Sequence, residues 1–155
     1  LKAPAEQVKA LDDRLKEIND MLKLFGEATF KLQPGESPVA VERAAWFRHG
    51  DKKAEDDPDG FIFLTTRRLL FEQNEKVATK KFLFITTASQ AIHQLLLDVP
   101  LAQVSTITPR DMGFLGLGEH MEVAFEGAAV SSAHFQLGAD NVKWQTMIQE
   151  AKAGR

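Results

Sequence analysis

The chain has 155 residues, of which 44% are hydrophobic and 26% are charged, a composition that fits a single globular domain with an appended element. It contains no cysteine, which excludes disulfides, thiol nucleophiles and cysteine-ligated zinc. Its net charge of −3 argues against a nucleic-acid partner, because such a partner requires a basic surface that neutralises phosphates.

No apolar run approaches the roughly 20 residues that a membrane-spanning helix needs. We therefore predict a cytoplasmic protein, with a peripheral position at a membrane as the alternative. Because the chain begins at Leu1 rather than at a methionine, we interpret it as a piece of a longer protein.

Residues 4–25 carry the clearest helical pattern. Apolar side chains recur at alternating intervals of three and four residues, which is typical of the narrow seam of an amphipathic helix. Pro4 suits the first helical turn, and we expect Gly26 to end the helix in a left-handed cap. We call this apolar stripe the arm seam; it comprises Val8, Leu11, Leu15, Ile18, Leu22 and Phe25.

The arm seam is too apolar to remain in water, because burying six such side chains contributes about 10 kcal/mol before ordering costs. We expect it to pack on the chain's own barrel, against the doubly apolar strand around Phe82 and Phe84. The alternative is a second copy of the same helix, which would make the protein a homodimer.

A turn signal at residues 33–38, with Pro34-Gly35 and Ser37-Pro38, follows the helix. We take it as the boundary between an N-terminal helical arm, residues 1–33, and a β domain, residues 39–153. The first strand is predicted over residues 39–48, with Val39, Val41, Ala45 and Phe47 on one face. Trp46 falls on the other face, where we expect its indole to cover a sheet edge or to pack under the arm.

The charged segment 49–59 must then leave the core as a loop. Its run Asp56-Asp57-Pro58-Asp59-Gly60 lacks the alternating ligands and the closing glutamate of a calcium loop, and we interpret it as a solvated acidic loop.

Residues 60–73, GFIFLTTRRLLFEQ, are the stretch around which the domain is organised. Two short apolar runs flank the polar step Thr65-Thr66-Arg67-Arg68, a pattern that predicts a β-hairpin bent at the threonines.

After the hairpin we expect a turn at 73–76, a strand over 77–86 and a turn within 87–94, where the spacing of Ile92, Leu95 and Leu96 would also suit a helix. Strands follow over 95–99 and 101–108, where Pro109 ends the second, and then over 120–125 and 133–137. In the strand 120–125, His120 is expected to face outward. Asp140 is placed to cap a last helix, whose apolar face consists of Trp144, Met147, Ile148 and Ala151.

The glycine, apolar strand, threonine turn, arginine and second strand of residues 60–73 resemble the signature of GRAM and bacterial PH-like domains. The step Pro100-Leu101-Ala102-Gln103-Val104 also resembles their pattern, whereas residues 77–94 depart from it. The resemblance implies a mainly β fold of the PH type. In this fold, an antiparallel barrel of seven or eight strands is capped by a C-terminal helix, here with an N-terminal amphipathic helix added.

Two surfaces are candidates for ligands. In PH domains that bind phosphoinositides a basic cluster follows the first strand, and Arg48, Lys52 and Lys53 match it in place. Arg67 and Arg68, at the hairpin bend, are further basic candidates that could meet an anionic ligand. The acidic residues of the same loop oppose anionic-lipid binding. The glycine-rich loop 112–119 carries Phe114, Leu115 and Leu117, which either fold over the barrel mouth or touch a membrane or partner.

Catalytic chemistry is not indicated. The four histidines show no metal-ligand spacing and are interpreted as surface or strand-facing residues, and Ser131, Ser132, His134 and Asp140 lack a nucleophile elbow. We therefore predict a non-enzymatic binding module without metal or cofactor, which docks a protein or peptide. The alternative is a peripheral domain that binds anionic or phosphoinositide lipid.

Overall fold

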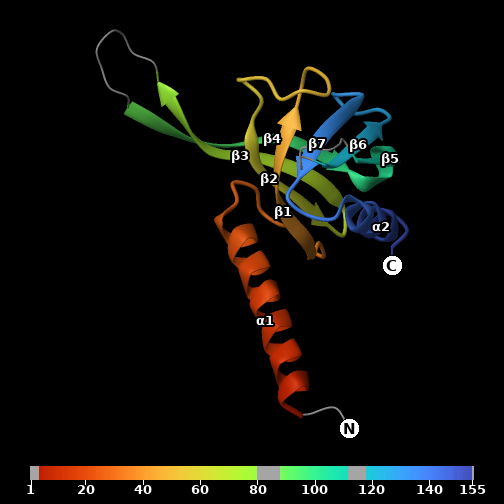
Figure 1. Ribbon diagram of the computed structural model, residues 1–155. Helices are drawn as coiled ribbons and strands as arrows, with labels where there is room; N and C mark the ends of the chain where they lie inside the picture. Colours follow the sequence, from red (N-terminus) through yellow and green to blue (C-terminus); the bar gives the residue numbers. More distant parts are fainter. Residues whose placement is uncertain (1–3, 80–87, 112–117, 155) are drawn as a thin grey trace.

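The computed structural model describes residues 4–79, 88–111 and 118–154 (Figure 1). Two helices, a short 3-10 turn and seven strands make up this part of the chain. In order they are α1 (Pro4–Glu27), β1 (Pro38–Phe47), β2 (Asp59–Thr65), β3 (Arg68–Thr79), β4 (Ala88–Pro100), η1 (Leu101–Gln103), β5 (Val104–Asp111), β6 (Glu119–Phe125), β7 (Ser132–Leu137) and α2 (Asn141–Lys152).

The strands form one antiparallel sheet in the order β4-β3-β2-β1-β7-β6-β5, so that β4 and β5 are its two edges. Figure 1 shows the sheet curving, with α2 packed beside β5–β7 and α1 projecting away from the sheet on its own. The expected architecture, a mainly β domain with a helix at each end of the chain, is confirmed. In the part of the chain that the structure describes, neither helix combines the length and the apolar composition that a membrane crossing requires.

The predicted hairpin is confirmed and forms β2 and β3, with Gly60 opposite Gln73 and Leu64 opposite Leu69. The bend lies at the threonines because the Thr65 hydroxyl oxygen accepts hydrogen bonds from the backbone N–H groups of Arg67 and Arg68, at 3.0 and 2.8 Å. Gly60 is required by close approach, since a Cβ there would lie 1.9 Å from the carbonyl oxygen of Glu72.

The main core lies between the curved sheet and α2. Its fully buried members include Ile62, Leu64, Phe71, Phe135 and Ile148, and Trp144 of α2 is only 3% exposed. Trp46 also belongs to this core, where its ring packs edge-on against Phe71 at 5.9 Å. The prediction that Trp46 covers a sheet edge or packs under the arm was therefore wrong.

Beyond the hairpin, two local predictions were wrong. Residues 73–76 form no turn, because β3 continues to Thr79 and pairs with β4, with Glu75 opposite Ile92. The turn expected within 87–94 is strand from Ala88 onward. Together β3 and β4 form a ribbon that extends beyond the rest of the sheet (Figure 1). The polar sequence of this ribbon results from its exposure to solvent and does not mark a turn. Residues 80–87 lie outside the described part.

Proline and glycine also differ from expectation. Pro109 lies inside β5, opposite Met121, and not at a strand end. This position is permitted because β5 is an edge strand, where proline's missing N–H removes no ladder bond. Gly26 lies within α1, which ends at Glu27, and it does not form the expected left-handed cap.

Candidate functional site

The base of α1 is fixed to the sheet by an aromatic cluster. Phe25 and Phe30 both contact Phe63 of β2, with ring centroids 5.0 Å apart and the rings edge-on. The three phenylalanines are buried together with Ala28 and Leu70. The end of α1 and the segment that follows it therefore form a second, smaller core on the sheet face opposite to the main one.

Polar contacts fix the same segment. The buried carboxylate of Glu72 accepts a hydrogen bond from the backbone N–H of Thr29 at 2.7 Å and another from the Thr29 hydroxyl. The Nε2 atom of His93 lies 2.6 Å from the other carboxylate oxygen. Strands β3 and β4 thereby hold the residue that comes two positions after α1.

Arg68 completes the attachment. Its Nε and Nη2 atoms donate to the two carboxylate oxygens of Glu36 at 2.8 Å each, Nη1 donates to Asp98 at 3.0 Å, and Nη2 also donates to the carbonyl of Lys31. Burial would raise the pKa of Glu36, but the hydrogen bonds from Arg68, Thr65 and the Gln33 N–H together lower it to about 2. Both partners are therefore charged inside the protein.

Along most of α1, none of the described residues covers the seam. Phe25 is buried, but the five other members, which we call the exposed seam, have relative exposures of 39% to 58%; they are Val8, Leu11, Leu15, Ile18 and Leu22. The prediction that the chain's own barrel covers the arm seam is therefore wrong for the described residues. The reason is geometric: only the last turns of α1 meet the sheet, and the helix then projects away (Figure 1). The strand expected around Phe82 and Phe84 lies outside the described residues.

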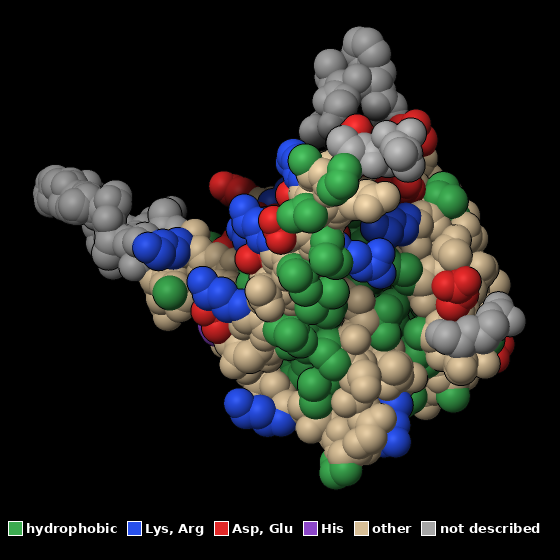
Figure 2. All heavy atoms as spheres, turned by 90° about the horizontal axis from the view of Figure 1, so that it is seen from below, with side chains coloured by type: hydrophobic (Ala, Val, Ile, Leu, Met, Phe, Trp, Pro, Cys, Tyr) green, Lys and Arg blue, Asp and Glu red, His purple; other side chains and the backbone are tan. Residues whose placement is uncertain are grey.

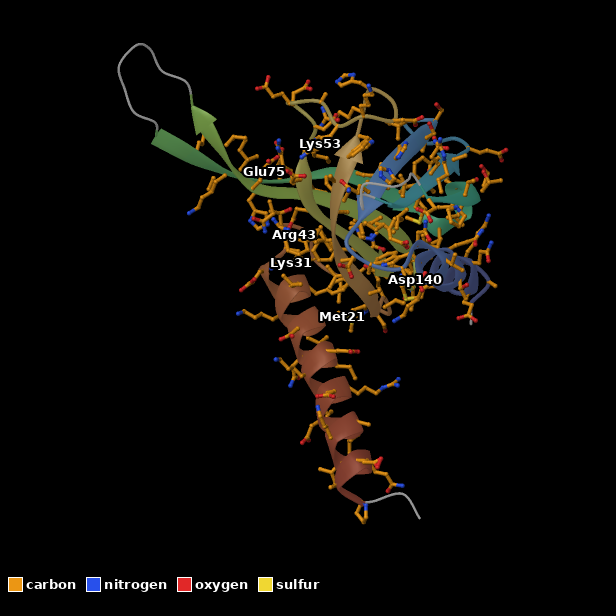
Figure 3. The ribbon with its side chains drawn as sticks, in the orientation of Figure 1. Met21, Lys31, Arg43, Lys53, Glu75 and Asp140 are labelled. Carbon is orange, nitrogen blue, oxygen red and sulfur yellow. The ribbon has the colours of Figure 1, made fainter. Side chains whose placement is uncertain are left out.

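A groove of about 740 Å³ lies where α1 leaves the domain, between α1, β1 and α2. Ile18 belongs both to the lining of this groove and to the exposed seam. The other apolar lining residues are Met21, Leu24, Val39, Ala40, Val41, Ala139, Trp144 and Met147, and the charged ones are Arg14, Glu17, Asp20, Glu42 and Lys143. Met21 lies on the side of α1 that faces β1 (Figure 3). Figure 2 shows the molecule from below, the side on which α1 projects in Figure 1. A band of hydrophobic side chains crosses this face.

The five basic residues proposed as ligand-binding do not come together. Arg48, Lys52 and Lys53 lie in the loop before β2, and Arg67 and Arg68 lie at the turn after it, so the length of β2 separates the two groups. Figure 3 shows Lys53 on that loop, well away from Lys31 at the base of α1. Lys53 forms an ion pair with Asp59 at 2.8 Å, and the guanidinium of Arg68 is engaged in its buried ion pair with Glu36.

Two further sequence interpretations can be placed. Asp57 is buried and not solvated, because its carboxylate accepts the backbone N–H groups of Arg48 and Ala54 at 2.9 and 2.7 Å and so closes the loop. The interpretation of that run as wholly solvated was wrong at this residue.

Phe114, Leu115 and Leu117, proposed as a partner or membrane loop, lie outside the described residues.

A buried histidine pair was missed. His120 Nδ1 and His134 Nε2 lie 2.7 Å apart, and the ring of Phe47 stacks on His134. The expectation that His120 faces outward was wrong, since it is 2% exposed. The alternation of strands β6 and β7 could have placed both histidines on one face, but their contact depends on the pairing register, in which Glu122 lies opposite His134.

Charged groups surround the exposed end of this pair. His134 Nδ1 lies 3.7 Å from both Asp51 and Glu122, and Arg110 bridges these two carboxylates at 3.2 and 3.3 Å. Burial lowers the pKa of His134, and the charge of His120 lowers it further. The cluster connects the loop after β1 with β5, β6 and β7. The positive charge that faces Asp51 and Glu122 comes from Arg110.

Comparison with known proteins identifies the fold. The solved structure of the Vps36 N-terminal PH domain matches with a TM-score of 0.52 and 18% sequence identity, covering 79% of this chain and 83% of that one. The DH/PH domains of p115-RhoGEF match with a TM-score of 0.45 and 14% identity over 95% of this chain and 42% of that one. No family model and no curated protein matches. The match to the Vps36 domain shows that the chain has a PH-like fold, and the narrower resemblance to GRAM and bacterial domains stays a prediction.

Proposed function

We propose that this PH-like domain is a non-enzymatic binding module that docks a protein partner through α1. The observation that carries the proposal is the exposed seam on a helix whose base is rigidly attached. Five large apolar side chains stay in water along one stripe, and only two other large apolar residues of the described part, Leu32 and Val142, are comparably exposed. Such a patch is typical of an interaction surface.

The form of the surface indicates the form of the partner. A stripe with alternating intervals of three and four residues accommodates the side chains of another helix, from a second protein or from a second copy of this chain. The groove at the base of α1 extends that surface onto β1 and α2. Because the attachment at Glu36, Arg68 and Glu72 fixes the arm, docking costs little ordering of the arm itself.

The test compares two variants that lower the net charge by one. Leu15→Glu places a charge in the exposed seam, and Lys16→Gln changes the opposite face of α1. We expect a partner, identified by affinity purification with wild-type protein and then purified, to bind wild type and Lys16→Gln with equal affinity and Leu15→Glu at least tenfold more weakly. Equal binding of all three proteins would contradict docking through the seam.

Vesicle pelleting tests the lipid alternative. Vesicles of phosphatidylcholine with phosphatidylserine or a phosphoinositide should sediment little wild-type protein, because the basic residues share their loop with the acidic residues Asp51, Glu55, Asp56, Asp57 and Asp59. Strong headgroup-selective pelleting, weakened by salt and abolished in the triple variant Arg48→Ala/Lys52→Ala/Lys53→Ala, would show that the domain binds lipid. Lipid would then replace a protein as the favoured partner.

A further inference from the structure

The exposed seam has the geometry to bind its own equivalent on a second copy of the chain. We infer that two copies pair through α1 in antiparallel orientation, with the tip of each arm beside the groove at the base of the other. The inference rests on the proposed function, since it names the occupant of the same surface.

The spacing of the seam supports helix-to-helix pairing. The interval pattern continues without interruption from Val8 to Phe25, and α1 extends about 36 Å at 1.5 Å per residue. A helix with matching spacing is the partner that would fill such a seam along its full length. Every copy of this chain carries one, and a two-fold pairing makes both seams bury each other.

Charge is compatible with self-pairing. Arg14 and Met21 flank the exposed seam on one side, and Asp12 and Asn19 flank it on the other. When the two seams are aligned antiparallel over their full length, Arg14 lies next to the second copy's Met21 and Asp12 next to the second copy's Asn19. No like charges face each other across this pairing, and most of the remaining charges of α1 lie away from it.

The groove selects the antiparallel orientation. It lies beside the last turns of α1, and its lining includes Ile18, Met21 and Leu24 together with Val39 and Met147. In an antiparallel pair, Leu11 of one arm lies opposite Leu22 of the other, so the apolar tip of each arm reaches this region. In a parallel pair the tips meet each other, and both grooves stay in water.

Disulfide trapping distinguishes the orientations, and the absence of cysteine gives a clean background. We expect an equimolar mixture of Leu11→Cys and Leu22→Cys proteins to form a disulfide heterodimer under mild oxidation, whereas neither variant crosslinks by itself. In the antiparallel pair two copies of position 11 are about 16 Å apart, eleven residues at 1.5 Å each, which is too far for a disulfide. Lys16→Cys on the opposite face should crosslink with neither protein.

The same experiment separates the possible failures. Crosslinking of each single variant with itself shows a parallel dimer and overturns the orientation. Light scattering should show a wild-type dimer, a Lys16→Gln dimer and a folded Leu15→Glu monomer with an unchanged circular dichroism spectrum. A wild-type monomer at every concentration overturns self-pairing. The proposed function then stands only if a different protein binds the wild type and does not bind the Leu15→Glu variant.

Discussion

Arg68 and Glu36 form a two-point ion pair inside the protein, although 32 residues separate them in the chain. The Glu36 side chain is completely buried, and that of Arg68 is 10% exposed. The pair joins the hairpin turn to the segment that follows α1. Buried contacts, and not a flexible linker, therefore set the direction in which the arm projects.

Removing the arginine should be costly. Arg68→Met leaves the Glu36 carboxylate buried without its counter-charge, and we expect a loss of about 3–5 kcal/mol in the free energy of unfolding, measured by urea denaturation. The matched control is Arg67→Met, one residue away and exposed, which should change stability by less than about 0.5 kcal/mol. Similar losses in both variants would contradict a specific role for the buried pair.

Stability should also fall with acid through Glu36. Its pKa is lowered from an ordinary 4.5 to about 2, so the unfolded chain takes up this proton at higher pH than the folded protein does. The contribution is thus fully present above pH 4.5 and is lost as pH falls toward 2. Glu36→Gln should be less stable at neutral pH, and its stability should fall less between pH 4.5 and 2 than that of wild type. Parallel profiles would refute this.

Local sequence signals predicted much of the fold. The hairpin could be predicted because its turn chemistry resides in Thr65 and its neighbours, and α2 because Asp140 accepts the backbone N–H groups of Val142 and Lys143 at 2.9 and 3.1 Å. The β3–β4 ribbon could not, because polar residues such as Asn74 and Glu75 become strand only through pairing with a distant segment.

The C-terminal helix gives the third prediction. Trp144 is 3% exposed and Ile148 is fully buried, whereas Met147 is only partly buried. Trp144→Ala should lower the free energy of unfolding by about 3–5 kcal/mol, because a large side chain leaves a cavity in the main core. Val142→Ala on the exposed face of α2 is the control and should have little effect. Equal effects on chemical denaturation would show that α2 does not close this core.

The candidate site was partly predictable, for a related reason. The spacing of the arm seam is a property of the sequence, but what covers the seam depends on where α1 points, which is decided by the contacts of Phe63, Arg68 and Glu72. Arg48, Lys52 and Lys53 were candidates because they match in place the basic cluster of phosphoinositide-binding PH domains, and Arg67 and Arg68 were candidates because they lie at the hairpin bend. Strand β2, which the hairpin pattern predicted, separates the two groups.

The histidine pair gives the last prediction, which concerns mildly acidic pH. His134 is 7% exposed, and the groups facing it are His120, Asp51, Glu122 and Arg110. Burial and the charge of His120 lower its pKa more than the two carboxylates raise it. The unfolded chain therefore binds this proton more readily than the folded protein, and stability should fall as pH drops below the ordinary histidine pKa of 6.5.

Thermal melting followed against pH measures this dependence. His134→Gln should flatten the decline in Tm that wild type shows below pH 6.5, whereas His49→Gln, which changes an exposed histidine of the neighbouring loop, should leave it unchanged. This decline begins at higher pH than the one due to Glu36, because the ordinary pKa values are 6.5 and 4.5. Side-chain NMR titration provides the direct measurement: a His134 pKa at or above 6.5 in the folded protein would refute the assignment, since a proton bound that readily would stabilise the fold in acid.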